Sequence, residues 1–262
     1  LMKQFKKNAP NWKKNELLNQ LKKFSKIYKD RPIKNNKGGM RFEHMFATYF
    51  ILKKVNPSVV IESGVFKGQS TWLIEKSLPK SKIISIDIDL DQREYISKKA
   101  HYSNLDFKYQ NFTRLPKNSL VFFDDHINHL DRIQQAKFFN IKNIILEDNY
   151  RPKKGDFYTI SHALNNAGFV HKLNRLSLIK TLVIFFKEFL KKFIYINNIF
   201  LTDELKYRIR DVKPNQNDKR NFLDIIDTYY EFPSVKKMIK SNMNISLAEL
   251  NSYNHITYLR LL

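Results

Sequence analysis

The chain of 262 residues contains no cysteine, and this absence excludes several kinds of site. Disulfide scaffolds, thiolate zinc sites, iron–sulfur clusters and cysteine nucleophiles all need a sulfur that this sequence lacks. Any metal ion must therefore be held by oxygen and imidazole ligands. Disorder is excluded as well, because 42% of the residues are hydrophobic and 14% are aromatic.

Acidic residues are also scarce, with 25 Asp and Glu against 47 Lys and Arg, so the formal net charge is +22. The excess is uneven along the chain. Residues 1–56 hold 15 basic and 3 acidic side chains, whereas residues 57–168 hold 16 and 13. A polyanionic partner and the codon bias of an A/T-rich genome both explain such a composition. The charge therefore indicates a basic N-terminal extension on a nearly balanced central domain.

Long uncharged apolar runs are missing too. Charged residues interrupt the most apolar stretch, 176–201, at Lys180, Lys187, Glu188, Lys191 and Lys192. A spanning helix needs about 20 predominantly apolar residues, and no segment has the pattern of a signal peptide. We therefore expect a cytoplasmic protein. For 176–201 the open interpretations are a helix packed on the domain, a substrate lid, a homo-oligomer contact or a peripheral membrane helix.

Hydrophobic periodicity predicts two N-terminal helices, at 11–30 and 42–54, followed by alternating strands and helices. The predicted strands are 59–62, 82–87, 107–109, 120–123, 143–146, 170–173 and 255–261. The predicted helices between them are 70–77, 91–99, 131–139 and 157–167. This order is typical of a doubly wound α/β domain with a Rossmann-like sheet. We divide the chain into an N-terminal helical extension or lid, 1–56, and a domain, 57–262, with a helical insertion at about 174–253.

The first strand leads into a turn that is typical of a ligand-binding site. Glu62 ends the strand, Gly64 permits a tight turn, and Gly68 and Ser70 open the next helix. The spacing differs from Gly-x-Gly-x-x-Gly, because Phe66 stands where a dinucleotide fold needs glycine. NAD and FAD are therefore disfavoured.

An acidic residue follows the second strand at the distance expected for a ribose ligand. Asp87 lies about 20 residues after the glycine turn. Asp89 is the second candidate, and as an alternative it caps a helix that begins near Asp91.

Polar residues also follow the fourth and fifth predicted strands. The fourth is followed by Asp124, Asp125 and His126, and the fifth by Asp148 and Asn149. Ends of neighbouring parallel strands lie about 5–10 Å apart. Asp125, Asp148 and Asn149 can therefore meet at one hard cation such as Mg²⁺.

These motifs resemble the class I S-adenosylmethionine-dependent methyltransferases, within them the metal-dependent O-methyltransferases related to the catechol and macrolide-sugar enzymes. The resemblance covers about 41–167. It implies a mostly parallel sheet with an antiparallel last strand, S-adenosyl-L-methionine as cofactor and Mg²⁺ or a similar divalent cation. The cofactor-binding residues that it implies are Glu62, Gly64, Phe66, Gly68, Ser70, Asp87, Gln110, Asn111, Asp125 and His126. The implied metal ligands are Asp125, Asp148 and Asn149.

One position departs from the catechol enzymes. Their catalytic Lys falls on Asn128, which cannot take a proton near neutral pH. We therefore expect His129 to accept the proton and His126 to lie beside the cofactor. Histidine here resembles some macrolide-sugar relatives and favours a hydroxyl of a sugar, a glycan in polysaccharide biosynthesis or another small molecule. The remaining histidines, His44 among them, we interpret as structural, and 38–44 as a candidate lid over the cofactor.

Three functions remain open at this stage. The first is O-methylation of a small-molecule or glycan acceptor, which the basic charge suggests is anionic. The second is RNA methylation, supported by the charge but disfavoured because no Asp/Asn-Pro-Pro-aromatic motif occurs. The third is a binding protein that uses a methyltransferase-like scaffold without catalysis.

Overall fold

The computed structural model describes residues 13–152, 154–167, 216–239, 245, 247–250 and 255–262. The chain divides into two compact units, one formed by residues 1–149 and 221–262 and the other by residues 150–220. The first unit contains the sheet together with the N-terminal helices. The first unit is therefore discontinuous in sequence, because it combines the segments before and after 150–220.

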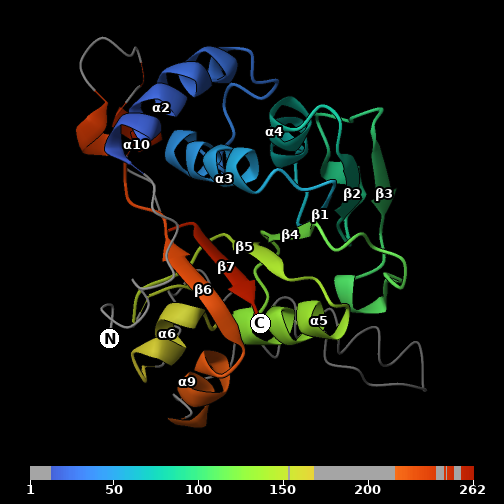
Figure 1. The fold of residues 1–262 in the computed structure, drawn as a ribbon. Helices are drawn as coiled ribbons and strands as arrows, with labels where there is room; N and C mark the ends of the chain where they lie inside the picture. The colour runs from blue at the N-terminus through green and yellow to red at the C-terminus, as the bar shows by residue number, and fades with distance from the viewer. Residues whose placement is uncertain (1–12, 153, 168–215, 240–244, 246, 251–254) are drawn as a thin grey trace, which may run out of the picture. The chain divides into compact units, whose positions relative to one another are not determined.

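The first unit is built on a sheet of seven strands in the order β3-β2-β1-β4-β5-β7-β6 (Figure 1). The strands are β1 (Val59–Ser63), β2 (Lys82–Ile86), β3 (Ala100–Ser103), β4 (Ser119–Phe123), β5 (Asn143–Leu146), β6 (Ile226–Glu231) and β7 (Thr257–Leu261). β1 to β5 pair in parallel, and β7 runs antiparallel to both β5 and β6. This is the Rossmann-like sheet of the class I methyltransferases, so the predicted fold class is confirmed.

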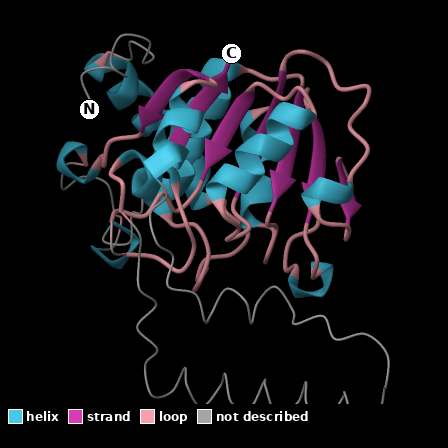
Figure 2. Cartoon of the chain, turned by 90° about the horizontal axis from the view of Figure 1, so that it is seen from below, coloured by secondary structure: helices cyan, strands magenta, loops and turns pink. Residues whose placement is uncertain are grey.

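Helices cover both faces of the sheet because alternate side chains of its buried strands point to opposite sides (Figures 1 and 2). On one face lie α2 (Lys14–Lys29), α3 (Phe42–Val55) and α4 (Gln69–Ser77). Val60, Leu120 and Ile145 belong to the core on this face. On the other face lies α5 (His129–Phe138). α3 is apolar around most of its surface and lies almost wholly buried between α2 and the sheet.

Two predicted elements around the third strand are wrong. The strand predicted at 107–109 is a short 3₁₀ helix, Phe107–Tyr109, and the third strand is Ala100–Ser103. The Phe107 ring packs among the rings of Phe112, Phe123 and Phe139, so its apolar side chain is buried without being part of a strand. The helix predicted at 91–99 is reduced to the 3₁₀ turn Leu90–Gln92.

The late insertion is also not wholly helical, since β6 lies within 174–253. The other described elements of this region are α9 (Gln216–Leu223), the 3₁₀ turn Lys236–Met238 and α10 (Leu247–Leu250). In the second unit α6 covers Ile160–Leu164 and is shorter than the predicted helix 157–167. The strand predicted at 170–173 and the stretch 176–201 fall outside the described residues. No helix among the described residues is long and apolar enough to cross a membrane.

Candidate functional site

Left-handed backbone conformations occur at the edge of the sheet where β1, β4 and β5 end and β7 begins. Apart from asparagine, which tolerates this region, the described non-glycine residues with positive φ are Phe66, His126, Asp148 and His255. Each follows β1, β4 or β5 or precedes β7 by a few residues. The register of β5 against β7, with Leu146 opposite Thr257, places the start of β7 at the same edge. Uncommon backbone conformations that occur together in this way are typical of functional sites.

Asp87 organises the turn after β1. Its Oδ2 accepts hydrogen bonds from the backbone N–H groups of Val65 at 2.7 Å and Phe66 at 2.9 Å. Gly64 is required here, since at φ +97° a Cβ would lie 2.1 Å from the carbonyl oxygen of Asp124. Asp89 instead caps the 3₁₀ turn that follows, accepting from the N–H of Asp91. The Asp87 carboxylate therefore lies at the turn after β1, and its binding of a ribose stays a prediction.

Glu62 lies beneath this turn rather than in it. Its fully buried carboxylate accepts hydrogen bonds from Thr71 Oγ1 and Ser85 Oγ, both at 2.6 Å. Burial raises the pKa of Glu62, although the hydroxyls of Ser70, Ser85 and Thr71 act in the opposite direction. Glu62 and Ser70 therefore join β1, β2 and α4, which holds the turn in shape.

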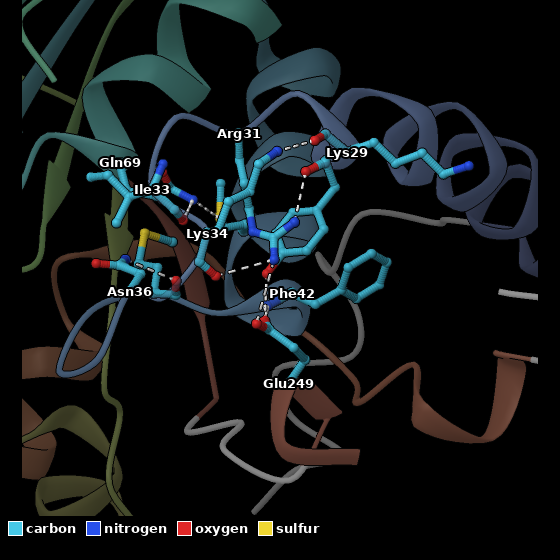
Figure 3. A network of polar contacts seen from close by, with 11 residues as sticks. Lys29, Arg31, Ile33, Lys34, Asn36, Phe42, Gln69 and Glu249 are labelled. Atoms are coloured by element: carbon cyan, nitrogen blue, oxygen red, sulfur yellow. Dashed lines mark hydrogen bonds and ion pairs between the residues drawn. The ribbon is translucent and has the colours of Figure 1, made fainter. Parts of the chain in front are cut away.

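The segment before α3 packs against the turn. The Gln69 side chain, at the start of α4, accepts from the N–H of Ile33 at 3.2 Å (Figure 3). A Cβ on Gly38 would lie 3.9 Å from the Phe66 ring. Glu249 of α10 holds the same segment by accepting from the N–H of Phe42 and pairing with Arg31 (Figure 3). The candidate lid therefore lies beside the predicted cofactor turn.

A cluster of three buried side chains follows β5. Glu147 and Asp148 extend from the strand end, and His44 reaches them from α3. His44 Nδ1 lies 2.7 Å from Glu147 Oε1, and one ligand atom from each of the three residues lies within 4.8 Å of the others. Their exposed fractions are 5%, 5% and 8%. Imidazole and carboxylate groups at this spacing can hold a metal ion.

Asp124, at the end of β4, adds a further carboxyl group to this region. Burial, together with the charges of Glu147, Asp148 and Glu62, raises the pKa of Asp124 well above its usual range, and His126 opposes the shift. Asp124 therefore favours its neutral form, in a region where two central strands end and where other carboxyl groups lie close to it.

Asp125 contacts Ser63 of β1 and Arg132 of α5. Its Oδ2 accepts from Ser63 Oγ at 2.5 Å and lies 2.9 Å from Arg132 Nη2. The Arg132 side chain, which is 2% exposed, also forms a bidentate pair with Asp106 at 3.0 and 2.7 Å. Burial raises the pKa of Asp125 despite the opposing charge of Arg132. A guanidinium group disfavours a cation at the same carboxylate, so the metal role of Asp125 stays a prediction without support from these contacts.

Asn149 is fully buried and connects the end of β5 to β6 and β7. Its Nδ2 donates to Tyr229 OH at 3.0 Å and to Thr257 Oγ1 at 2.9 Å. Of the two predicted carboxylate ligands, Asp148 belongs to the cluster with His44 and Glu147. The metal role of Asn149 also stays a prediction.

The two predicted catalytic histidines differ in environment. His126 is exposed, with φ 55°, on the loop after β4. His129 begins α5, is 2% exposed, and its Nε2 lies 3.1 Å from the carbonyl oxygen of Glu147. Asn128, which stands where the catechol enzymes have Lys, caps α5 by accepting from the N–H of Leu130.

Gln110 and Asn111 lie after the 3₁₀ turn 107–109. Gln110 Nε2 donates to Ser103 Oγ at 2.8 Å, and Asn111 Oδ1 accepts from Thr113 Oγ1 at 2.9 Å. Gln110 thus lies next to the end of β3. The cofactor role of both residues stays a prediction.

Sequence reasoning missed His44, Glu147 and Arg132. Glu147 directly precedes Asp148 at a strand end, and this position, next to a predicted ligand, could have identified it as a candidate. His44 and Arg132 lie within helices, and no local pattern distinguishes them from structural residues. Their importance depends on which carboxylates the fold brings to them.

Comparison with known proteins finds structural likeness only. No protein-family model and no curated protein sequence matches the chain. Among solved structures, the methyltransferase PaMTH1 of Podospora anserina with S-adenosylhomocysteine bound shares 8% identity, with 100% of this chain and 93% of that chain covered and a TM-score of 0.49. A putative O-methyltransferase of Klebsiella pneumoniae shares 10% identity, with 99% and 94% covered and a TM-score of 0.42.

CmcI with magnesium and S-adenosylmethionine shares 16% identity with this chain and has a TM-score of 0.36. The likeness covers 47% of this chain and 64% of the CmcI chain. For apo CmcI the chain spans about half of that protein, 52%. These TM-scores are all below 0.5, so the strand order of the sheet, rather than the likeness, establishes the fold.

Proposed function

We propose that this protein is an S-adenosylmethionine-dependent, divalent-metal-assisted O-methyltransferase that acts on a hydroxyl of a sugar, a glycan or another small molecule. The observation that carries the proposal is the meeting of two features at one edge of a methyltransferase-type sheet. These are the turn organised by Asp87 and the buried carboxylates that follow β5. Ligands of doubly wound sheets bind at the carboxyl ends of the strands.

The turn after β1 would bind the cofactor. Asp87 Oδ1 accepts from the N–H of Asp89 and Oδ2 from two more N–H groups. A carboxylate can accept about four hydrogen bonds. Three of these positions on Asp87 are taken by backbone N–H groups, which leaves about one for a ribose hydroxyl. Phe66, whose ring lies beside Gly38, supplies an aromatic side chain at this turn that would contact the cofactor.

The donor set of the cluster fits a divalent cation. Glu147 and Asp148 would hold it through carboxylate oxygens, the ligands that such ions prefer. A bound cation would polarise and orient the acceptor hydroxyl. The chain's own groups would then position that oxygen and exclude water, because His44, Glu147 and Asp148 are all buried.

For the proton of the hydroxyl we keep the two histidines of the segment after β4. His126 is exposed on the loop after β4, where it would take the proton from an acceptor bound at this edge of the sheet. His129 is buried, and its Nε2 lies 3.1 Å from the backbone carbonyl oxygen of Glu147. With Nε2–H donating there, Nδ1 would be the ring nitrogen that accepts a proton. Loss of turnover in His126→Ala with turnover kept in His129→Ala would assign the proton to His126, and the reverse result would assign it to His129.

Cofactor binding tests the proposal directly. Calorimetry with S-adenosylhomocysteine should show one site per chain, and Asp87→Asn should weaken binding about tenfold or more, because it removes a charged hydrogen-bond acceptor. Asp89→Asn is the matched control, since Asp89 caps the neighbouring turn, and it should bind normally. Absence of binding in the unmodified protein would favour a non-catalytic binding protein instead.

A further inference from the structure

We propose that His44 supplies a nitrogen ligand to the cation held by Glu147 and Asp148, so that the site selects a transition metal such as Mn²⁺ over Mg²⁺. The inference rests on the metal site of the proposed function and adds a ligand to it. It also changes the expected metal, because the predicted ligand set of Asp125, Asp148 and Asn149 offers oxygen alone.

The spacing of the cluster suits direct coordination. Around one octahedral ion with bonds of about 2.1 Å, adjacent ligand atoms lie about 3 Å apart and opposite ones about 4 Å. His44 Nδ1 and Glu147 Oε1 are 2.7 Å apart, and the ligand atoms of all three residues lie within 4.8 Å of one another. Small side-chain movements would therefore bring the three residues onto one ion.

The charge of the cluster also favours a cation. Two carboxylates and one imidazole lie together in a place where all three residues are more than nine-tenths buried. Carboxylates removed from water are costly unless positive charge compensates them. A divalent ion bound between the Glu147 and Asp148 carboxylates would offset their negative charge.

The backbone holds His44 and Asp148 where this coordination needs them. His44 lies in the first turn of α3, between Phe42 and Met45, which are both 0% exposed. Its neighbour Glu43 anchors the same turn through hydrogen bonds to Ser234 and the backbone N–H groups that follow. Asp148 adopts φ 51°, in the left-handed region that glycine, asparagine and aspartate tolerate best. Rigid support of this kind is what a metal ligand requires.

Ligand chemistry then determines the choice of metal. Mg²⁺ prefers oxygen ligands and keeps much of its water. Imidazole nitrogen suits the first-row transition metals, and a site with one nitrogen and two carboxylates accepts Mn²⁺ or Fe²⁺ readily. His44 would therefore discriminate between the two classes of ion.

Binding of the metal alone to the full chain tests the inference. After treatment with a chelator, calorimetry should show Mn²⁺ binding about tenfold or more tightly than Mg²⁺. Pulsed electron paramagnetic resonance of the Mn²⁺ complex should show coupling to a ¹⁴N nucleus. His44→Gln should abolish that coupling and weaken Mn²⁺ binding about 10- to 100-fold, with Mg²⁺ binding changed only slightly. His101→Gln, which removes an exposed imidazole from β3, should change neither measurement.

Three results would overturn the inference. They are an Mn²⁺ spectrum of the unmodified protein without nitrogen coupling, coupling that persists in His44→Gln, and an equal loss of Mn²⁺ and Mg²⁺ affinity in that variant. The last result would mean that His44 only orients Glu147. If His44→Gln does not fold, His44→Asn replaces it, and the unmodified protein's spectrum still decides. Normal binding of S-adenosylhomocysteine with no metal binding would overturn this inference and leave the cofactor part of the function intact.

Discussion

In the first unit, carboxyl groups that are partly or fully buried have pKa values shifted in opposite directions, according to the groups that surround each one. Burial alone would raise the pKa of Asp106, but the hydrogen bonds and charge of Arg132 outweigh it and hold that pKa below its ordinary value. At Glu62 burial, together with the charge of Asp87, outweighs the hydrogen bonds from three hydroxyl groups, so its pKa is raised. Asp106 therefore supports folding at neutral pH, whereas ionised Glu62 opposes it.

Glu62 predicts a measurable pH dependence of stability. Its folded-state pKa lies above the ordinary value of 4.5, so the folded protein binds this proton more tightly than the unfolded chain does. The contribution of Glu62 is therefore most favourable below the ordinary pKa and declines as the pH rises through the raised one. Glu62→Gln should remove this decline, so the free energy of unfolding of the variant relative to the unmodified protein should increase from pH 4 to pH 8. Denaturant unfolding across this range measures it.

Glu94→Gln serves as the control for that series, because Glu94 has a half-exposed side chain paired with Lys67. Its stability relative to the unmodified protein should stay nearly constant across the same pH range. A Glu62→Gln variant whose relative stability falls with rising pH would contradict the prediction, whatever the absolute cost of the substitution.

Among the elements, α3 connects parts of the chain that are distant in sequence. Its first turn carries Glu43, which holds the segment after β6, and His44, which meets Glu147 after β5. The same helix packs by Phe46 and Phe50 against Phe232 at the end of β6. α3 is thus the element through which the N-terminal segment contacts both the sheet edge and the candidate metal site.

Removal of the Glu43 carboxylate should release the segment after β6. Its Oε1 accepts from Ser234 Oγ at 2.6 Å and from the N–H groups of Val235 and Lys236 at 2.8 and 3.0 Å. Each buried donor that loses its acceptor costs about 1–3 kcal/mol. In Glu43→Ala the amides of Val235 and Lys236 should therefore exchange hydrogen faster, by a factor of about 5 or more.

Hydrogen exchange followed by mass spectrometry measures this change. Glu16→Ala is the control, because Glu16 makes only a partly exposed ion pair with Lys54 on the surface of α2 and α3. Unchanged exchange at 235–236 in Glu43→Ala would show that packing of Val235, which is 1% exposed, holds the segment without the carboxylate.

For the first unit as a whole, the candidate metal site joins segments from its beginning and middle, and the last strand completes the sheet beside them. An ion bound by His44, Glu147 and Asp148 would bind the folded state and not the unfolded chain. Such linkage stabilises a protein by about 2.7 kcal/mol when the free ion is at 100 times its dissociation constant. We therefore expect Mn²⁺ to raise the melting temperature of the chelator-treated protein.

Asp148→Asn should remove that stabilisation, because it neutralises one of the two carboxylates. Asp91→Asn, at an exposed position after β2, should retain the full increase in melting temperature. Thermal unfolding at several Mn²⁺ concentrations measures both variants. An equal increase in all three proteins would mean that the ion binds elsewhere on the chain.

The sequence by itself determined the central features of the sheet. The buried strands β1, β2, β4 and β5 are short apolar runs, and a polar or acidic residue marks the end of each, so local pattern located them together with Gly64, Asp87 and Asp148. Apolar residues recur along a helix or a strand with the period of that element, so the sequence alone reveals which segments are buried strands.

Tertiary structure alone decided which charges meet. The pairing of His44 with Glu147 and of Arg132 with Asp125 and Asp106 joins helices to strand ends that no sequence spacing connects. Tertiary packing also overrode two predictions made from local sequence patterns. Phe107 packs in an aromatic cluster instead of a strand, and β6 pairs with β7 within the insertion that was predicted to be helical. Ion pairs and edge strands depend on neighbours that the fold supplies, so only the folded chain reveals them.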